Sequence, residues 1–262
     1  MHFTKMHGLG NDYLYVYGEV PEKAGALSVQ LSERHFGAGS DGMIWISPSK
    51  IADFKMRIFN ADGSEAKMCG NGIRCVGKYV YDKGYTEKTE ITVETLSGIK
   101  SLKLTVIDGK VGQVCVEMGK AVCSDEKTLE IDGKKIVCMP VSVGNPHAVL
   151  FVKKVEEEML TTLGPKIEKH KDFEGGVNVE FVEVIAPTLL RMRVWERGSG
   201  VTMACGTGAC ASVRAAVEKG YCRAGEFVTV RLDGGDLQVK VDGEGNVHMN
   251  GPALFVYEGE TI

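Results

Sequence analysis

Two stretches of the sequence repeat each other: MRIFNADGSEAKMCGNGIRC at residues 56–75 and MRVWERGSGVTMACGTGAC at residues 192–210. With a shift of 136 residues, the Met-Arg pairs that begin them coincide, and so do the Cys-Gly-x-Gly runs near their ends. Apolar strand-forming residues follow each Met-Arg pair, and a Gly-containing turn separates them from the cysteine. The pattern predicts a strand, a turn and a helix that begins directly after a cysteine, twice. Those cysteines are Cys69 and Cys205.

The elements around the two stretches also repeat. Gly10-Asn11 before the strand YLYVY corresponds to Gly144-Asn145 before AVLFV, with a shift of 134 residues. Helices are expected at 26–36, after Cys69 as far as Gly84, at 155–163 and at 206–219, with alternating β-strand segments between them. We therefore predict an α+β fold of two pseudo-symmetric lobes with an interlobe active-site cleft, each lobe a mostly antiparallel β-sheet or barrel around a central α-helix.

The lobe boundary is expected near Gly119. The N-terminal lobe would span 1–118 and the C-terminal lobe 119–251. The last strand, ALFVYE, remains after the second set of strands. We expect it to return to the first lobe, so that residues 252–262 complete that lobe.

Composition excludes several classes of function. The formal net charge of −4 and the scattered Lys and Arg residues give no sign of nucleic-acid binding. The N-terminal MHFTKMHGLGND lacks an apolar signal-peptide core, and no apolar run is long enough to span a bilayer, so we expect a cytoplasmic protein with no membrane partner. Its eight cysteines contain no C-x-x-C pair, which disfavours a structural zinc site, and in the cytoplasm they are expected to be reduced.

A thiol at a helix start has a specific chemical use. The positive end of the helix dipole favours the thiolate and lowers the pKa below its usual value of about 8.5. The following Gly-x-Gly lets backbone N–H groups approach an anion such as a carboxylate. Two such thiols on opposite sides of one carbon suit racemisation, because one removes a proton from one face and the other delivers a proton to the opposite face. The alternatives are a purely structural Cys-Gly cap, and a duplication in which only one site is active.

At NADGSEAKMCGNGIRC, GNPHAV, GGVNVEFV and ERGSGVTMACGTGAC the sequence resembles the diaminopimelate epimerases, cofactor-independent isomerases of lysine biosynthesis. MHGLGND at the N-terminus is similar to that family too. The resemblance implies a two-lobed, PLP-independent homodimer without metal that interconverts LL-2,6-diaminopimelate and meso-diaminopimelate. It implies that Cys69 and Cys205 are the acid–base pair.

The resemblance also implies which residues contact the substrate. The amides at Gly70-Asn71 and Gly206-Thr207 would hold the reacting carboxylate. The other implied contacts are Asn11, Asn60, Asn145, Asn178, Glu196 and Arg197. Arg197 suits the distal carboxylate as a planar fork, and Glu196 suits the distal ammonium. Asn60 and Glu196 each lie nine residues before their cysteine, which supports a shared orientation. His147 is either an aid to one thiol or a supporting histidine behind the site.

Two positions depart from the family pattern. Val201 stands where the family usually has Glu, although the first copy keeps Glu65 at the equivalent place. The family varies between Gln and Gly at Gly42, where a side-chain contact would be absent here. Two rival functions remain open: a proline racemase-like enzyme, disfavoured by Glu196 and Arg197 because proline has no second charged end, and a thiol redox or sensor protein that uses the two cysteines.

Overall fold

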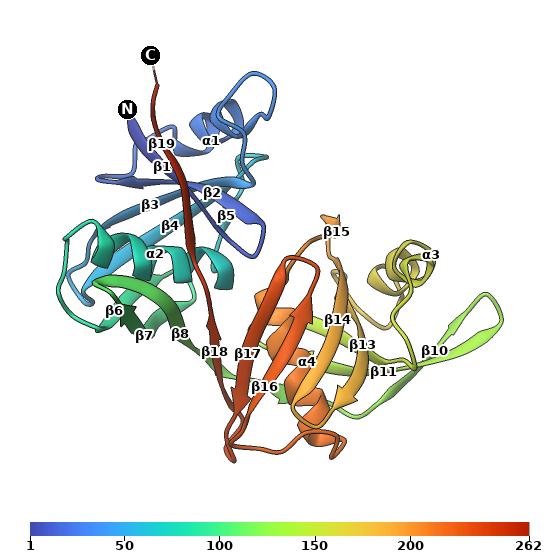
Figure 1. Cartoon of the computed structure of the whole chain (residues 1–262). Coiled ribbons are helices and arrows are strands. Elements are labelled where there is room, and N and C mark those ends of the chain that lie inside the picture. Colours follow the sequence, from blue (N-terminus) through green and yellow to red (C-terminus); the bar gives the residue numbers. More distant parts are fainter. Residues whose placement is uncertain (262) are drawn as a thin grey trace. The chain divides into compact units, whose positions relative to one another are not determined.

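The computed structural model describes residues 1–261 and divides the chain into two compact units. Unit 1 comprises Met1–Glu117 together with the C-terminal segment from Asn250, and unit 2 comprises Met118–Met249. Both units contain helices and a mixed but mostly antiparallel sheet, so the predicted α+β class is confirmed (Figure 1). None of the helices in the described part of the chain is long and apolar enough to cross a membrane.

Unit 1 follows the order that the sequence predicts. Its helices are α1 (Ala24–Ser32) and α2 (Gly70–Asp82). Its strands are β1 (His2–Gly8), β2 (Asn11–Tyr17), β3 (Gly42–Pro48), β4 (Phe54–Asn60), β5 (Glu65–Ala66), β6 (Glu90–Thr95), β7 (Gly98–Ile107), β8 (Lys110–Lys120) and β19 (Leu254–Glu260). The last strand, β19, pairs antiparallel with β1 and so belongs to this unit.

Unit 2 repeats the same order of elements. Its helices are α3 (Glu157–Glu168) and α4 (Gly206–Glu218). Its strands are β9 (Val122–Cys123), β10 (Lys127–Ile131), β11 (Lys134–Ser142), β12 (Pro146–Phe151), β13 (Asn178–Ala186), β14 (Leu189–Glu196), β15 (Gly200–Val201), β16 (Phe227–Leu232), β17 (Gly235–Val241) and β18 (Asn246–Gly251).

Strand pairing shows that the two units share one topology. In unit 1, β2 pairs parallel with β3, β3 antiparallel with β4, and β4 parallel with β6. In unit 2, β12 pairs parallel with β13, β13 antiparallel with β14, and β14 parallel with β16. The repeat first seen around the cysteines therefore extends to these four strands of each unit.

The helix that follows each cysteine is the central helix of its unit. Every residue of α2 from Gly70 to Val80 is buried. Gly77 permits part of this packing, because a Cβ there would lie 2.9 Å from a methyl of Leu104. Most of the Ala-rich α4 is buried in the same way. A helix held on all sides gives the residue at its start a fixed position.

The first helix of each unit differs from its predicted bounds. Helix α1 stops at Ser32, because Glu33 turns extended with ψ of 123°, and Phe36 is 94% exposed instead of packing on the helix. Helix α3 begins two residues late and continues through Pro165 to Glu168. Val155, where we placed its start, lies in the loop before the helix and donates its backbone N–H to the carboxylate of Glu183 on β13.

Candidate active site

Cys69 is the N-cap residue of α2. Its φ of −138° and ψ of 113° are extended, as expected for a cap, and its Sγ accepts a hydrogen bond from the backbone N–H of Gly72 at 3.3 Å. Its carbonyl accepts the next helical amide, that of Ile73. The amides of Gly70 and Asn71 thus precede the first intrahelical donor, the amide of Ile73, and lie at the positive end of the helix.

A polar chain connects the Cys69 thiol to a carboxylate. The thiol donates to Oδ1 of Asn11 at 3.3 Å, and Nδ2 of Asn11 donates to Asp41 at 2.8 Å. Asp41 also accepts from the backbone N–H of Asp12 and from Arg34. Because the carboxylate can only accept, it directs the amide nitrogen of Asn11 towards itself and the amide oxygen towards sulfur. In this arrangement Cys69 makes its hydrogen bond as a protonated thiol.

Cys205 caps α4 in the same way. Its φ of −114° and ψ of 109° are extended, and its Sγ accepts from the backbone N–H of Gly208 at 3.3 Å. Thr207 Oγ1 lies 3.5 Å from the sulfur, and Asn145 Nδ2 donates to the same hydroxyl oxygen at 3.3 Å. Since Thr207 accepts from Asn145, its own hydroxyl proton can point to the sulfur of Cys205.

This second chain continues into the core of unit 2. Oδ1 of Asn145 lies 3.1 Å from Nε2 of His147, and Nδ1 of His147 lies 2.7 Å from the carboxylate of Glu180. The side chains of His147 and Glu180 are both fully buried. Both ring nitrogens of His147 thus face oxygen atoms, and the ring links Asn145 to the buried carboxylate of Glu180.

Burial and charge act on Cys205 against the helix dipole. Burial raises the pKa of the Cys205 thiol well above its usual value, and the carboxylates of Glu196 and Glu180 raise it further. The hydrogen bonds from Thr207 and Gly208 lower the pKa of Cys205, but by less. Burial also raises the pKa of Glu196, and the charge of Glu180 adds to this. The prediction that a helix start favours the thiolate is therefore wrong for Cys205.

The Glu196–Arg197 pair lies at the end of β14, in the turn to β15. The side chain of Glu196 accepts a hydrogen bond from the hydroxyl of Thr202. The backbone N–H of Arg197 donates to Oδ1 of Asn178 at 3.0 Å, and its guanidinium donates to the carbonyl of Gly175 at 3.1 Å. Asn178 in turn donates from Nδ2 to the carbonyl of Pro146. Asn178 thereby connects the turn that carries Arg197 with the start of β12.

The structure brings most predicted site residues of each unit together. In unit 2 the hydrogen-bonded groups are Cys205 with Thr207, Asn145 and His147, and Asn178 with Arg197. In unit 1 Asn11 contacts Cys69 directly. Asn60 instead donates from Nδ2 to the hydroxyl of Ser64 within its own turn.

Comparison with known proteins agrees with this arrangement. The sequence matches the family model for diaminopimelate epimerase over residues 3–124 and 139–256. It is 53% identical to the diaminopimelate epimerase of Acetivibrio thermocellus over 99% of this chain and 98% of that protein. It is 51% identical to the diaminopimelate epimerase of Methanococcus maripaludis strain C5, with 99% of each chain covered. The chain belongs to the diaminopimelate epimerase family.

The fold is shared with more distant enzymes. The crystal structure of a hydroxyproline epimerase from Agrobacterium vitis aligns with a TM-score of 0.74 over 99% of this chain and 91% of that chain, at 17% identity. At that level of identity the likeness shows the fold alone. By contrast, the similarity to the diaminopimelate epimerases is a sequence identity of about half over nearly the whole chain.

The structure explains why a diaminopimelate epimerase tolerates Val201. The equivalent Glu65 forms an ion pair with Arg57, Nη2 to Oε2 at 2.7 Å, on the outside of unit 1. In unit 2 the equivalent Arg193 pairs instead with Asp233, Nε to Oδ2 at 2.7 Å. Val201 is exposed. The cap contacts of Cys205 to Thr207 and Gly208 do not involve it.

At Gly42 the structure gives a steric reason for glycine. Its φ of +153° is rarely adopted by residues with a side chain. A Cβ there would overlap the carbonyl oxygen of Phe59 and lie 2.9 Å from Cα of Asn60. Both are backbone atoms of β4, so in this chain no side chain fits at residue 42.

Sequence reasoning missed the two carboxylates that organise unit 2, Glu180 and Glu168. Glu180 lies in the run VNVEFV, where every residue is buried. A Glu inside such a run is rare unless it is paired, and that was the available signal. Glu168 gives no comparable signal, because it ends a polar-rich helix and its partners are brought to it by tertiary folding.

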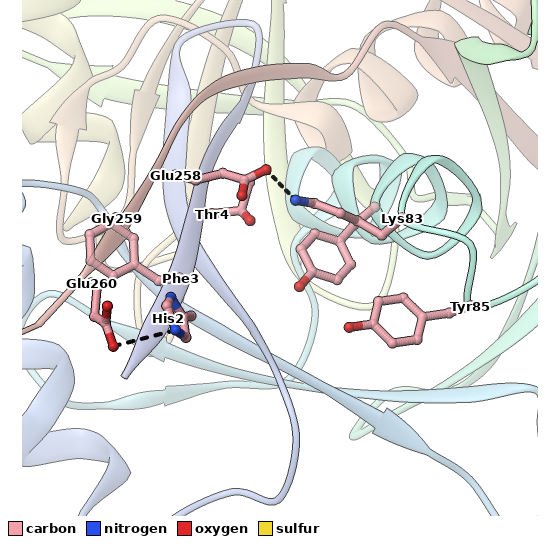
Figure 2. A pocket seen from close by; sticks show the side chains of 9 residues that line it. His2, Phe3, Thr4, Lys83, Tyr85, Glu258, Gly259 and Glu260 are labelled. Carbon is pink, nitrogen blue, oxygen red and sulfur yellow. Dashed lines mark hydrogen bonds and ion pairs between the residues drawn. The ribbon is translucent and has the colours of Figure 1, made fainter.

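A separate open pocket lies away from both cysteines. It has a volume of about 400 Å³ and lies in unit 1 between β1, β19 and the end of α2. Figure 2 shows Lys83 paired with Glu258, and His2 in contact with the carboxylate of Glu260. Its lining contains no residue of the predicted site. Within residues 1–261 no group of three or more His, Cys, Asp or Glu side chains is placed to hold a metal ion.

Proposed function

We propose that this protein interconverts LL-2,6-diaminopimelate and meso-diaminopimelate in the cytoplasm, as a step of lysine biosynthesis, by inverting one α-carbon without a cofactor. The observation that carries this proposal is the duplicated thiol cap. Two helices each begin at a cysteine whose sulfur accepts the third helical amide at 3.3 Å. They do so in a chain about half identical over its full length to proteins named diaminopimelate epimerase.

The proposed reaction balances through the two sulfur atoms. One cysteine, as thiolate, takes the α-proton, and the C–H electron pair remains on the substrate as a carbanion. The other cysteine, as thiol, gives its proton to the opposite face and becomes the thiolate. The substrate is inverted, and Cys69 and Cys205 have exchanged protonation states. Each direction therefore uses the opposite member of the pair as base.

The carbanion requires stabilisation, because an α-proton beside a carboxylate is a very weak acid. In the proposal, the helix-start amides at Gly70-Asn71 and Gly206-Thr207 bind that carboxylate. They combine oriented N–H donors with the positive ends of two helix dipoles. Removal of one such preorganised donor typically costs a factor of about 10²–10³ in rate.

The distal end of diaminopimelate supplies the specificity. Arg197 binds the distal carboxylate and Glu196 the distal ammonium. Four asparagine side chains provide further hydrogen-bond donors and acceptors: Asn11, Asn60, Asn145 and Asn178. The half-buried Glu196 supports this assignment, because an ammonium is the group that best compensates its charge. A substrate without the distal charges would leave these groups unpaired.

We further propose that the protein is a homodimer that uses β19. Four consecutive large apolar residues of this strand, from Leu254 to Tyr257, are between 36% and 52% exposed. Large apolar side chains that are exposed in such number on one strand support an interaction site. Sedimentation of the wild-type protein and of Val256→Glu tests this, since the substitution should yield a monomer. A wild-type protein that sediments as a monomer refutes it.

The decisive experiment measures exchange of the substrate α-proton with D₂O, followed by NMR. The wild-type protein should exchange and epimerise LL-diaminopimelate, whereas Cys69→Ser and Cys205→Ser should each lose epimerisation. Cys123→Ser is the matched control, since Cys123 is partly exposed and lies outside both caps. Full activity of Cys69→Ala or Cys205→Ala would contradict the two-base mechanism.

Substrate controls separate the rival functions. Activity on proline or hydroxyproline alone would favour the racemase of a different substrate class. A thiol redox protein would show no turnover of any amino acid and a reversible response to oxidant. The proposed epimerase should also be inactivated reversibly by oxidants, but it differs from a redox protein because its reduced form turns over diaminopimelate.

A further inference from the structure

The carboxylate of Glu168 bridges the two sides of the Glu196–Arg197 pair. Its Oε2 accepts from the indole N–H of Trp195 at 2.7 Å, and its Oε1 accepts from the backbone N–H of Gly198 at 3.0 Å. The two donors come from the residue before the pair and from the residue after it. One carboxylate oxygen therefore holds the side chain of Trp195 and the other the backbone of Gly198, on either side of the pair.

Glu168 is itself held firmly. It is the last residue of α3 and is only 9% exposed. Its backbone carbonyl accepts from the N–H of Val177 at 3.3 Å, which fixes the helix end against the start of β13. Trp195 packs against α3 as well, because a Cβ on Gly164 would lie 2.7 Å from the first side-chain atoms of that tryptophan. The anchor is thus rigid at both of its ends.

The first copy of the repeat carries a corresponding device. The hydroxyl of the fully buried Ser28, on α1, shares its one proton between the carbonyls of Phe59 at 2.8 Å and Asn60 at 2.9 Å. Phe59 and Asn60 are the repeat equivalents of Trp195 and Glu196. In both units the first helix therefore fixes the strand end that carries a proposed substrate contact, with a hydroxyl in one case and a carboxylate in the other.

We propose that Glu168 is a positioning residue for the Glu196–Arg197 pair, and so for recognition of the distal ammonium and carboxylate of the substrate. This rests on the function proposed above. Glu168 acts on the substrate only through the turn that it holds. A carboxylate is required because its two oxygens serve two N–H donors, whereas a glutamine has one oxygen and would place its NH₂ against the second donor.

The test is Glu168→Gln, assayed for α-proton exchange on diaminopimelate. The KM should rise by about tenfold or more, while kcat changes less, because the variant weakens binding of the distal end, and a saturating substrate still brings its ammonium to Glu196. Glu130→Gln, an exposed change of the same chemistry in unit 2, is the matched control and should keep wild-type constants.

Rescue by a second substitution separates positioning from simple stabilisation. Trp195→Phe removes the indole N–H and keeps an aromatic ring, as at the equivalent Phe59. In the double variant Glu168→Gln/Trp195→Phe, the glutamine oxygen can accept from Gly198 while its NH₂ no longer opposes an indole N–H. The KM should therefore move back towards the wild-type value. A structural role alone would lower the melting temperature and leave KM unchanged.

The outcomes distinguish two failures. If the wild-type protein is active and Glu168→Gln keeps a wild-type KM, the positioning role is overturned and the proposed function stands. If kcat falls and KM does not rise, the positioning role is also overturned. If the wild-type protein does not exchange the α-proton of diaminopimelate, the proposed function fails and the positioning role fails with it.

Discussion

Substitution of Gly208 by Ala tests how tightly the core of unit 2 holds the Cys205 cap. A Cβ at this position would lie 2.8 Å from Oε1 of Glu180 and 3.2 Å from Sγ of Cys205. Glu180 is fully buried, and the same Oε1 lies 2.7 Å from His147, so the carboxylate cannot move away without losing that hydrogen bond. The added methyl group therefore meets a fixed charged group.

The magnitude follows from three contributions. Overpacking of a dense core costs about 1–3 kcal/mol. Loss of a hydrogen bond to a buried charged group costs about 1.5–3 kcal/mol. The better helix propensity of Ala returns up to about 1 kcal/mol. We expect Gly208→Ala to lower the free energy of unfolding by about 1.5–6 kcal/mol.

The repeat supplies the control, Gly72→Ala. A Cβ there would lie 2.6 Å from Cδ1 of Ile44 and 3.4 Å from Sγ of Cys69. Cδ1 is the end of a flexible side chain and can rotate away, so the net cost should be only about 0–2 kcal/mol. Urea unfolding followed by circular dichroism measures both variants. A Gly208→Ala protein as stable as Gly72→Ala would refute the view that Glu180 and His147 are held rigidly behind the cap.

Three further predictions follow from particular groups. Glu196→Gln should lower the pKa of Cys205, because the charge of Glu196 raises that pKa. Alkylation of Cys205 at fixed pH should then accelerate by about tenfold for each unit by which the pKa falls, while the rate of alkylation of Cys69 stays unchanged. Gly42→Ala should lower the free energy of unfolding by about 3 kcal/mol or more in urea, because the new Cβ overlaps backbone atoms; wild-type stability would contradict this. Burial raises the pKa of Cys75 from 9.0 to about 11. As pH rises, the thiol of the unfolded chain ionises before that of the folded chain, so the free energy of unfolding is unaffected below pH 9 and falls as pH rises towards 11. Cys75→Ala should reduce this fall in the free energy of unfolding by up to about 1.4 kcal/mol per pH unit.

The repeat made much of the fold predictable. A shift of 136 residues placed Cys69 and Cys205 at equivalent helix starts, and the structure shows both as N-caps with matching Sγ contacts. Alternating apolar patterns located the main strands, because a sheet with one packed face leaves that period in the sequence. The ends of α1 and α3 were less predictable, since they depend on contacts such as that of Val155 with Glu183.

The electrostatics of the site could not be predicted in the same way. A helix dipole is a local property that is visible from the position of a cysteine before Gly-x-Gly. Burial and the approach of distant carboxylates are tertiary properties. Glu180 comes from β13 and Glu196 from β14, and both raise the pKa of a thiol on α4. The dipole argument alone gives the wrong direction for Cys205 because it omits these charges.

The two copies differ in what they present to sulfur. Asn11 offers an amide oxygen to Cys69, and the thiol donates its hydrogen bond to it. Cys205 is kept protonated by burial and by Glu196, although Thr207 and Gly208 direct hydrogen bonds to it. At Cys205 the helix start alone therefore does not produce the thiolate that the proposed reaction needs.

The distal ammonium of the substrate can supply a positive charge that favours the thiolate of Cys205. In the proposed function, Glu196 binds the distal ammonium, and this neutralises the second largest cause of the raised pKa at Cys205. Asn11, as a substrate contact, would turn its amide oxygen from the thiol of Cys69 to the ligand. Both changes favour loss of a proton from sulfur, and they occur only when a molecule with the correct distal group is bound. Recognition of the distal end and activation of the thiols are then one event, which confines the reactive thiolate to the complex with the correct substrate.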